Sequence, residues 1–476
     1  MNLSKNKKKN PWLIVGVLVF SAFIALFNET ILNVALITIS KDLRVSVSAV
    51  QWLITGYMLV TSVMVPITAF LYESIPTKRL FQIAMGIVLV GTLGCFFAGS
   101  FPVLLGFRMF QAIGTGMMIP IMMSTTLIVA PREKLGAAMA MCVMGITLGP
   151  AFGPTLSGIM MQLFSWRATF ALIAAFSAVM FIAGSLVIDN VAELRYPKLD
   201  ILSVVLSVAG LAVFLYGISI VASQPLNGLA FIAAGAVVIA FFVRRQGRLA
   251  EPMLSFAPFK NRIFVLGLIM VTIAMLINFS MNVLMPSFLQ EAYGVSSSIS
   301  AIVLLPGILL NAVSTGISGK ILDKGGAGRM IPLGFLTATV FLAVLAAFSA
   351  HSALPVVILT HILLYQGLAF SMSPAQTSAL AVLPKELNPH GVSLVNTFMQ
   401  IAASLGSSLF GGISATVQAS AAAGGASSAS AATSGFTAAI FVAAGIACTG
   451  LILALIFSRS CAQGAAAPSD ATAQEN

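Results

Sequence analysis

The sequence predicts an all-α integral membrane protein with fourteen transmembrane helices, and three observations support this prediction. Of the 476 residues, 59% are hydrophobic and only 8% are charged, and the mean hydropathy is +1.04. Apolar runs of about 20 residues, the length that crosses a bilayer as a helix, recur along almost the whole chain. Basic residues gather in alternate loops between these runs. Soluble proteins carry about 25% charged residues, so the composition excludes a soluble fold.

The spans follow one another with short connections. We place them at 12–36, 49–72, 80–99, 102–130, 135–161, 168–188, 199–222, 228–244, 262–290, 298–320, 330–349, 354–381, 391–416 and 436–458. The first run is too long for a signal peptide and lacks a small-residue cleavage site, so we predict a retained helix. A charge-free run of Ala, Ser, Gly and Thr at 415–435 is typical of a flexible linker, and we expect it outside the membrane.

The distribution of Lys and Arg predicts the orientation. With the amino terminus in the cytoplasm, 20 of the 24 basic residues fall on the cytoplasmic side. Cytoplasmic loops of membrane proteins carry this excess of basic residues. We therefore expect a multi-pass protein of the cell (cytoplasmic) membrane with both termini in the cytoplasm. The rule also explains the net charge of +11 without nucleic acid as a partner.

Two similar turns suggest an internal repeat. One spans Glu73 to Arg79, and the other spans Gly319 to Gly326 and contains Asp323. Each turn alone could be an ordinary cytoplasmic loop. If the helices over 199–244 are treated as an insertion, the two turns occupy equivalent places in two six-helix halves. Transporters built from internal structural repeats show this arrangement. The predicted organisation is a cytoplasmic basic amino terminus (1–11), a six-helix bundle (12–188), two extra helices (199–244), a second six-helix bundle (262–458) and a disordered cytoplasmic tail (459–476).

Several motifs resemble a known family. Helix 1 carries Phe27-Asn-Glu-Thr-Ile-Leu-Asn-Val-Ala-Leu36, helix 4 carries Arg108-Met-Phe-Gln-Ala-Ile-Gly114, and helix 5 carries Gly145-x-x-x-Gly-Pro-x-x-Gly-Pro154, followed by Ser165-Trp-Arg167. The second half carries Pro286-x-x-x-Gln290, Leu305-Pro-Gly307 and Asn396-Thr-x-x-Gln400. The chain thus resembles the major facilitator superfamily and, within it, the lincomycin-resistance-like branch of the fourteen-helix drug:proton antiporters. The resemblance implies two six-helix bundles with two additional helices between them, and export driven by a proton gradient.

The chain departs from the family pattern at two places. Asn28 stands where many relatives have Asp, with Glu29 beside it. Ala69 and Pro76 stand in the first turn where the family usually has Gly.

Glu29 and Arg108 are the two charged residues well inside apolar spans. A charge inside a membrane costs ~2.5–3.5 kcal/mol on insertion scales, so such residues are functional candidates. We predict that Glu29 carries the coupling proton and that Arg108 is a fixed counter-charge or a backbone anchor, since it does not deprotonate. A structural contact between helices 1 and 4, or an interfacial position of Glu29, are the alternatives.

Other polar residues in the spans are candidates for binding substrate or for bonding between helices. The predicted substrate-binding residues are Asn33, Tyr57, Gln111, Met117, Asn278, Asn282, Tyr365, Gln366, Asn396 and Gln400. Close helix packing or a pivot is expected where glycines fall four apart on one face. The residues predicted to govern conformational change are Glu73, Arg79, Gly145, Gly149, Pro150, Gly153, Pro154 and Asp323.

These observations together predict a secondary transporter. We expect a monomer that exports lipophilic neutral or monocationic compounds in exchange for protons, with no cofactor. Export of a specific metabolite or lipid is the alternative within transport. No nucleophile motif or phosphate-binding loop indicates an enzyme, and the four cysteines show no metal-binding spacing. A receptor is disfavoured because no soluble output domain is present.

Overall fold

The structure is a computed structural model that describes residues 10–192, 194–195, 200–325, 327–349 and 353–466. Its elements are helical, and the described part of the chain contains no strand. The long helices are α1 (Pro11–Thr30), α4 (Trp52–Ser74), α5 (Thr77–Phe96), α6 (Phe101–Val129), α7 (Leu135–Leu163), α8 (Trp166–Val187), α9 (Ile201–Ile220), α10 (Pro225–Gln246), α11 (Arg262–Tyr293), α12 (Ser297–Asp323), α13 (Ala327–Phe348), α14 (Leu354–Ala381), α15 (Asn388–Ala423) and α16 (Ser428–Ala466). The short ones are η1 (Ile31–Val34), α2 (Leu36–Asp42), α3 (Val47–Val50), η2 (Arg132–Lys134), η3 (Ala257–Lys260) and η4 (Lys385–Leu387).

The number of spans agrees with the prediction. Thirteen helices of the described chain are long and apolar enough to cross a membrane. The span predicted over 135–161 corresponds to α7, which is 29 residues long. Counting α7 with the thirteen gives fourteen, and the all-helical membrane fold is confirmed.

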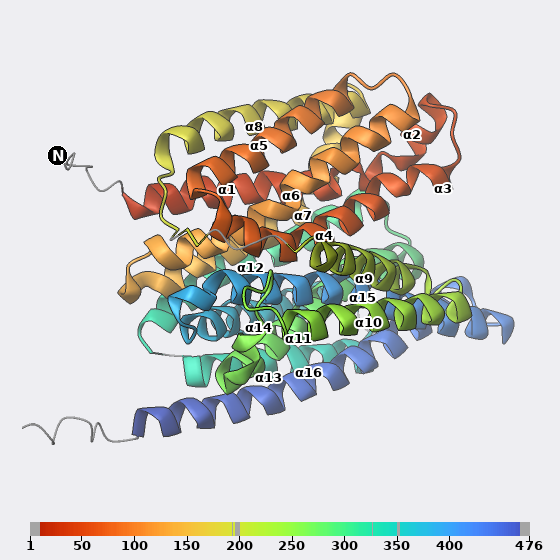
Figure 1. The fold of residues 1–476 in the computed structure, drawn as a ribbon. Coiled ribbons are helices and arrows are strands. Elements are labelled where there is room, and N and C mark those ends of the chain that lie inside the picture. Colours follow the sequence, from red (N-terminus) through yellow and green to blue (C-terminus); the bar gives the residue numbers. More distant parts are fainter. Residues whose placement is uncertain (1–9, 193, 196–199, 326, 350–352, 467–476) are drawn as a thin grey trace, which may run out of the picture.

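The long helices form two bundles that correspond to the two halves of the chain. Helices α1 and α4 to α8 pack together, and so do α11 to α16. In Figure 1 the first bundle, in red to yellow, lies above the second, in green to blue. The bundles meet along two seams, one between α7 and α12 and the other between α4 and α15.

Short polar signals separate the helices of the second bundle. The Asn261 side chain accepts hydrogen bonds from the backbone N–H groups of residues 263 and 264 and caps the start of α11. Gly294, with a φ of 67°, ends that helix in the left-handed conformation that glycine adopts without strain. Ser296 then caps α12 through the N–H of Ile299. A turn this tight sends α12 back antiparallel to α11.

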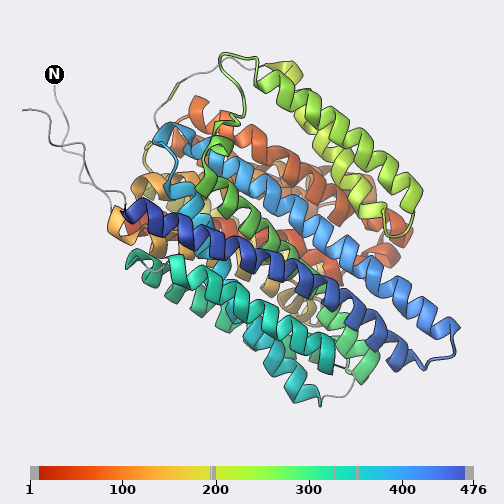
Figure 2. The same cartoon turned by 90° about the horizontal axis from the view of Figure 1, so that it is seen from below.

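The two extra helices, α9 and α10, form a hairpin at the edge of the molecule (Figure 2). Helix α9 packs against α4 and α15, one from each bundle, while α10 packs on α9. An ion pair between Arg245 and Asp200, with N–O distances of 2.6 and 2.8 Å, joins the two helices at one end. The hydrogen bonds from Arg245, and then those from Ser203, hold the pKa of the Asp200 carboxyl well below its usual value.

Two of the predicted irregular segments are helical instead. Most of 415–435, expected as a flexible loop, belongs to α15 and α16, and only 424–427 separate these helices. Residues 459–466, expected in a disordered tail, continue α16, while 467–476 lie outside the described residues. Alanine is the most frequent residue in both segments and has the highest intrinsic helix propensity. The composition therefore favours a helix, although it resembles that of a linker.

The first span also ends earlier than predicted. Helix α1 stops at Thr30, and the chain tightens into the 3-10 turn η1 before α2.

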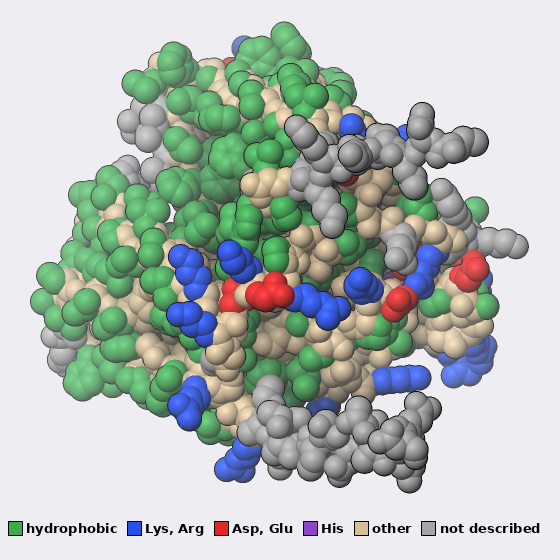
Figure 3. Space-filling view, turned by 90° about the vertical axis from the view of Figure 1, so that its left-hand side faces the viewer, with side chains coloured by type: hydrophobic (Ala, Val, Ile, Leu, Met, Phe, Trp, Pro, Cys, Tyr) green, Lys and Arg blue, Asp and Glu red, His purple; other side chains and the backbone are tan. Residues whose placement is uncertain are grey.

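Charged residues gather at one end of the helices. Figure 3 looks onto the end at which α1 begins and shows Lys, Arg, Asp and Glu side chains across it. Lys78 at the start of α5, Arg132 in η2 and Lys320 near the end of α12 belong to this end, which we call the basic end. The other end, where α1 runs out toward α2, is called the opposite end. There Arg167 donates a hydrogen bond of 2.8 Å to Asp42 and, with a second bond from Trp166, lowers the pKa of that carboxyl.

Candidate functional site

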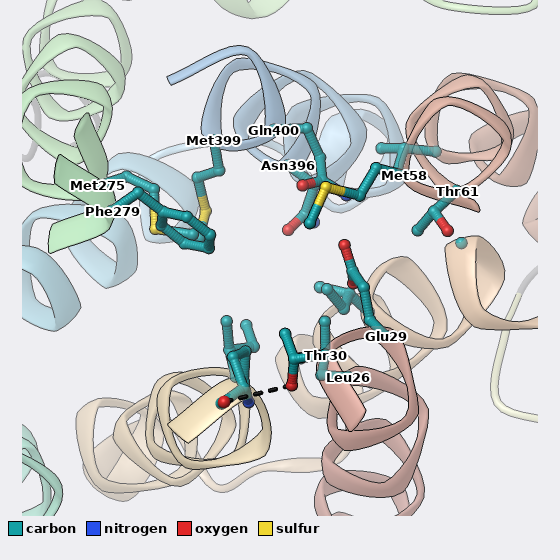
Figure 4. Close-up of a pocket in the computed structure, with 15 residues that line it drawn as sticks. Leu26, Glu29, Thr30, Met58, Thr61, Met275, Phe279, Asn396, Met399 and Gln400 are labelled. Carbon is teal, nitrogen blue, oxygen red and sulfur yellow. Dashed lines mark hydrogen bonds between the residues drawn. The ribbon is translucent and has the colours of Figure 1, made fainter. Parts of the chain in front are cut away.

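A central cavity with about 580 Å³ of empty space lies between the two bundles (Figure 4). Helices α1, α4, α6 and α7 line it from the first bundle, and α11 and α15 line it from the second. Its walls are formed by Leu26, Glu29, Thr30, Met58, Thr61, Val65, Gly116, Ile119, Ile146, Pro150, Met275, Phe279, Asn396, Met399 and Gln400. The mostly apolar lining with a few polar groups is typical of a site for a small molecule.

Glu29 is the one charged residue among those lining the central cavity. It lies one residue before the end of α1, and its side chain points into the cavity in Figure 4. The residue is only 7% exposed. Among the described residues none donates a hydrogen bond to its carboxylate or forms an ion pair with it, so the carboxyl is available to a proton or to a bound cation.

Arg108 lies behind Glu29, fully buried in the first bundle. Its guanidinium donates hydrogen bonds to the backbone carbonyls of Asn28 (2.7 Å), Glu29 (3.3 Å) and Leu53 (3.3 Å). It also stands over the ring of Tyr57, 3.9 Å from the ring centre. Arg108 therefore binds the backbone at the end of α1, and its hydrogen bonds do not reach the Glu29 carboxylate.

The side chain of Asn28 joins the same network. Its carbonyl oxygen accepts a bond of 2.9 Å from Arg108, and its amide donates one of 3.0 Å to the Tyr57 hydroxyl. An amide supplies an acceptor and a donor together, whereas an ionised carboxylate only accepts. Asn28 is therefore a structural partner of Arg108 and leaves Glu29 as the titratable group on this part of α1.

The glycines of α7 form the face that packs against α1. A Cβ atom on Gly145 would lie 2.9 Å from the Val19 side chain, and one on Gly149 would lie 2.8 Å from Cβ of Leu26. A Cβ on Gly153 would overlap Thr30. The predicted close approach is thus present. Next to these glycines, the Thr30 hydroxyl donates a hydrogen bond of 3.2 Å to the carbonyl of Pro150.

Polar contacts between the bundles close the cavity toward the basic end. Asp323, the last residue of α12, accepts hydrogen bonds from the N–H groups of Gly136 (2.6 Å) and Ala137 (3.0 Å) at the start of α7. In the other seam, Ser393 of α15 donates a bond of 2.9 Å to the carbonyl of Val65, which lines the cavity.

A third contact at the basic end joins His390 of α15 to Glu73 of α4, with an N–O distance of 3.4 Å. Glu73 was predicted to govern conformational change, but His390 was not, because a lone histidine carries no sequence signal. Arg79, predicted with Glu73, is exposed.

A side pocket with about 300 Å³ of empty space adjoins the central cavity. The two share Ile146, Pro150, Met275 and Phe279. The side pocket is completed by Thr147, Asn278, Asn282 and Met372.

Comparisons with known proteins identify the family. The family model described as Major Facilitator Superfamily matches residues 18–407. The chain belongs to the Major Facilitator Superfamily. The uncharacterized MFS-type transporter YcnB of Bacillus subtilis (strain 168) is 36% identical over 467 residues, which are 96% of this chain and 98% of that protein. Lincomycin resistance protein LmrB of the same organism is 34% identical over 407 residues, 84% of this chain and 85% of that protein.

The solved structures agree on the fold. The structure of the MFS proton:xylose symporter XylE covers 94% of this chain and 95% of its own, with a TM-score of 0.66 and 13% identity. This major facilitator protein is therefore a multi-pass membrane transporter of small molecules, and the resemblance that its motifs predicted is confirmed.

Four of the predicted substrate-binding residues line the cavities of this transporter. Asn396 and Gln400 line the central cavity, and Asn278 and Asn282 line the side pocket.

Five further predicted residues, Tyr57, Gln111, Met117, Tyr365 and Gln366, are not among the residues that line either pocket. Tyr57, Gln111 and Met117 are buried within the first bundle, where the first two serve the Arg108 network. Tyr365 and Gln366 bond within the second bundle, to Asn282 and Ser314. Polar side chains in apolar spans also hydrogen-bond between helices. The side chains of Asn33 and Pro154 lie outside the described residues.

Several lining residues were not predicted, and one signal could have found some of them. Met275 and Phe279 share a helix face with Asn278 and Asn282, because residues three and four apart lie together on a helix. The two asparagines mark this face as polar, so the neighbouring apolar positions could have been assigned to the cavity with them. Met58 and Thr61 of α4 have no such marker.

Proposed function

We propose that this transporter is a proton-coupled exporter of lipophilic neutral or monocationic compounds, working by alternating access in the cell membrane with both termini in the cytoplasm. The single observation that supports proton coupling best is Glu29, a buried carboxyl that points into the central cavity. The names of relatives such as lincomycin resistance protein LmrB support compounds that are toxic to the cell as substrates.

Proton movement is coupled to substrate movement because a proton and a cationic substrate compete for the Glu29 carboxyl. In an apolar cavity the neutral, protonated carboxyl is favoured, whereas water or a cationic substrate favours the charged form. A proton that enters from the opposite end therefore leaves when the cavity opens at the basic end, where a substrate takes its place. Inward movement of one proton yields ~2.3 kcal/mol per 100 mV of membrane potential. No cofactor is required in this cycle.

The positions of the cross-bundle contacts support alternating access. The contacts of Asp323 and His390 lie at the basic end, and Ser393 lies three residues after His390 on α15, at the wall of the cavity. With this end in the cytoplasm, the conformation is closed to the cytoplasm. Export then requires these contacts to break and the opposite end to close.

Transport in vesicles tests the proposal. Purified protein is reconstituted, a pH difference is imposed, and uphill movement is measured for a panel of antibiotics, metabolites and lipids. We expect lipophilic monocations to be concentrated. Transport of a metabolite or lipid in their place would show the alternative function.

Glu29→Gln keeps the size of the side chain but does not titrate. We expect it to abolish uphill transport and to retain downhill exchange of substrate, because the conformational change itself needs no titration. Glu133→Gln, the same change at an exposed residue of the basic end, is the control and should transport as the wild type does. Uphill transport by Glu29→Gln with only a pH difference as the driving force would disprove the assignment.

A further inference from the structure

The two adjoining pockets differ in charge. Glu29 supplies a carboxyl to the central cavity, whereas no charged residue is among those that line the side pocket. A charged group placed in the side pocket would lose its hydration without gaining a counter-charge, which is unfavourable. The side pocket therefore suits a neutral group.

The two asparagines of the side pocket form a hydrogen-bonded chain with Tyr365, which lies behind them. The Tyr365 hydroxyl donates to the side-chain oxygen of Asn282 at 2.9 Å, and the Asn282 amide donates to the side-chain oxygen of Asn278 at 3.3 Å. This direction occupies the single side-chain oxygen of each asparagine, and none of the described residues accepts a hydrogen bond from the remaining amide N–H groups. Free amide N–H groups bind oxygen acceptors such as hydroxyls, carbonyls and ethers.

Tyr365 is held in place from behind. It is 2% exposed, and its ring packs against that of His361 with the centroids 4.5 Å apart. Its carbonyl also accepts a hydrogen bond from the side chain of Asn311. The hydroxyl that fixes Asn282 is therefore rigid, while Asn282 itself is exposed toward the pocket.

The wall common to both pockets is apolar. Met275 and Phe279 belong to both, and in Figure 4 they lie across the central cavity from Glu29. A molecule that extends from Glu29 into the side pocket passes along these side chains, so its middle part is apolar.

We infer that the side pocket is a second binding subsite and that it selects amphiphiles with a particular arrangement of groups. These substrates carry one cationic centre, which pairs with Glu29, an apolar middle part, and a neutral oxygen-rich end that accepts hydrogen bonds from Asn278 and Asn282. The inference rests on the proposed function, whose substrate class it narrows.

The test compares two monocationic probes that differ in hydrogen bonding. Lincomycin has one amine and a polyhydroxyl end, whereas tetraphenylphosphonium has a single charge and no hydrogen-bonding group. Equilibrium binding of each radiolabelled probe is measured with purified protein in lipid nanodiscs. Asn282→Leu should weaken lincomycin binding by about tenfold, the upper end of what one lost hydrogen bond contributes, and should change tetraphenylphosphonium binding by less than about twofold.

Two variants complete the set. Tyr365→Phe keeps the ring against His361 and removes only the hydroxyl that orients Asn282, so it should weaken lincomycin binding selectively as well. Gln290→Leu is the control on the same helix, because Gln290 is exposed and its amide bonds only the backbone carbonyl of Pro286 among the described residues. It should leave both probes unaffected.

Three outcomes would overturn the inference, and they separate it from the proposed function. Equal losses for both probes in Asn282→Leu would show that Asn282 shapes the whole cavity, which removes the subsite and leaves the exporter intact. Unchanged binding of both probes would remove the subsite in the same way. The wild-type protein could also bind neither probe and concentrate no monocation under a pH difference. That result would disprove the proposed function together with the inference.

Discussion

Replacing Asp323 with Asn should shift this transporter from the state closed at the basic end toward the state open there. The two carboxylate oxygens bind the N–H groups of Gly136 and Ala137, at 2.6 and 3.0 Å, across the seam between α12 and α7. These N–H groups start α7 and have no partner within their own helix, so the carboxylate both satisfies them and faces the positive end of the helix dipole. Separation of the bundles breaks both bonds.

The size of the shift follows from the bonds lost. A hydrogen bond to a charged group contributes about 1.5–3 kcal/mol, and a charge at a helix terminus contributes about 0.3–1 kcal/mol. Asn keeps one acceptor oxygen and loses the charge. A net loss of about 2 kcal/mol from the closed state corresponds to about a thirtyfold shift of the equilibrium between the two states.

Distance measurements by electron spin resonance can detect this shift. Spin labels at the exposed positions Glu133 and Lys324 lie on opposite sides of the seam, in a background with Cys448 and Cys461 replaced by serine. We expect a longer distance between the labels to become populated in Asp323→Asn. Asp42→Asn makes the same change of charge at the opposite end and should leave the distances unchanged.

The assignment of Asp323 to conformational exchange would be wrong under either of two results. One is a distance distribution identical to that of the wild type. The other is weaker equilibrium binding of substrate with unchanged rates of exchange between the states, because Asp323 lies outside both pockets.

The remaining predictions concern the packing of α1. Gly149→Ala should lower the melting temperature, since its Cβ would lie 2.8 Å from that of Leu26 and overpacking costs about 1–3 kcal/mol. Gly16→Ala, with nothing within 4 Å of the new Cβ, should raise it through helix propensity; equal effects of the two changes would refute the close contact with α7. Arg108→Lys should destabilise the first bundle by about 3–5 kcal/mol, because a single ammonium does not replace the guanidinium bonds to three carbonyls and each bond from a charged group contributes about 1.5–3 kcal/mol. Thermal unfolding in detergent measures all three effects, and a wild-type melting temperature for Arg108→Lys would contradict the anchoring role.

The sequence by itself determined the features that depend on local chemistry. Apolar runs of bilayer length specify spans wherever they fold, because a membrane requires backbone hydrogen bonds to close within each helix. The same reasoning singled out Glu29, since a lone carboxyl in an apolar run is costly to insert. The glycine spacing of α7 was equally visible, because positions four apart share a helix face whatever the partner is.

The tertiary structure alone decided which faces meet. In a soluble protein the apolar stripe of a helix marks its buried side, but in a membrane both the lipid-facing and the buried sides are apolar. The sequence therefore did not show that Met275 and Phe279 face the cavity or that Tyr57 and Gln111 lie behind its wall.

The partners of the charged residues were likewise set by the fold. Arg108 binds the backbone carbonyls of Asn28 and Glu29, which lie 80 and 79 positions earlier in the chain. Asp323 caps a helix that begins nearly two hundred residues earlier. Backbone carbonyls and N–H groups are present at every position, so no side-chain pattern identifies the ones that will be used. Only the packing of α1 on α6 and of α12 on α7 brings these groups within bonding distance.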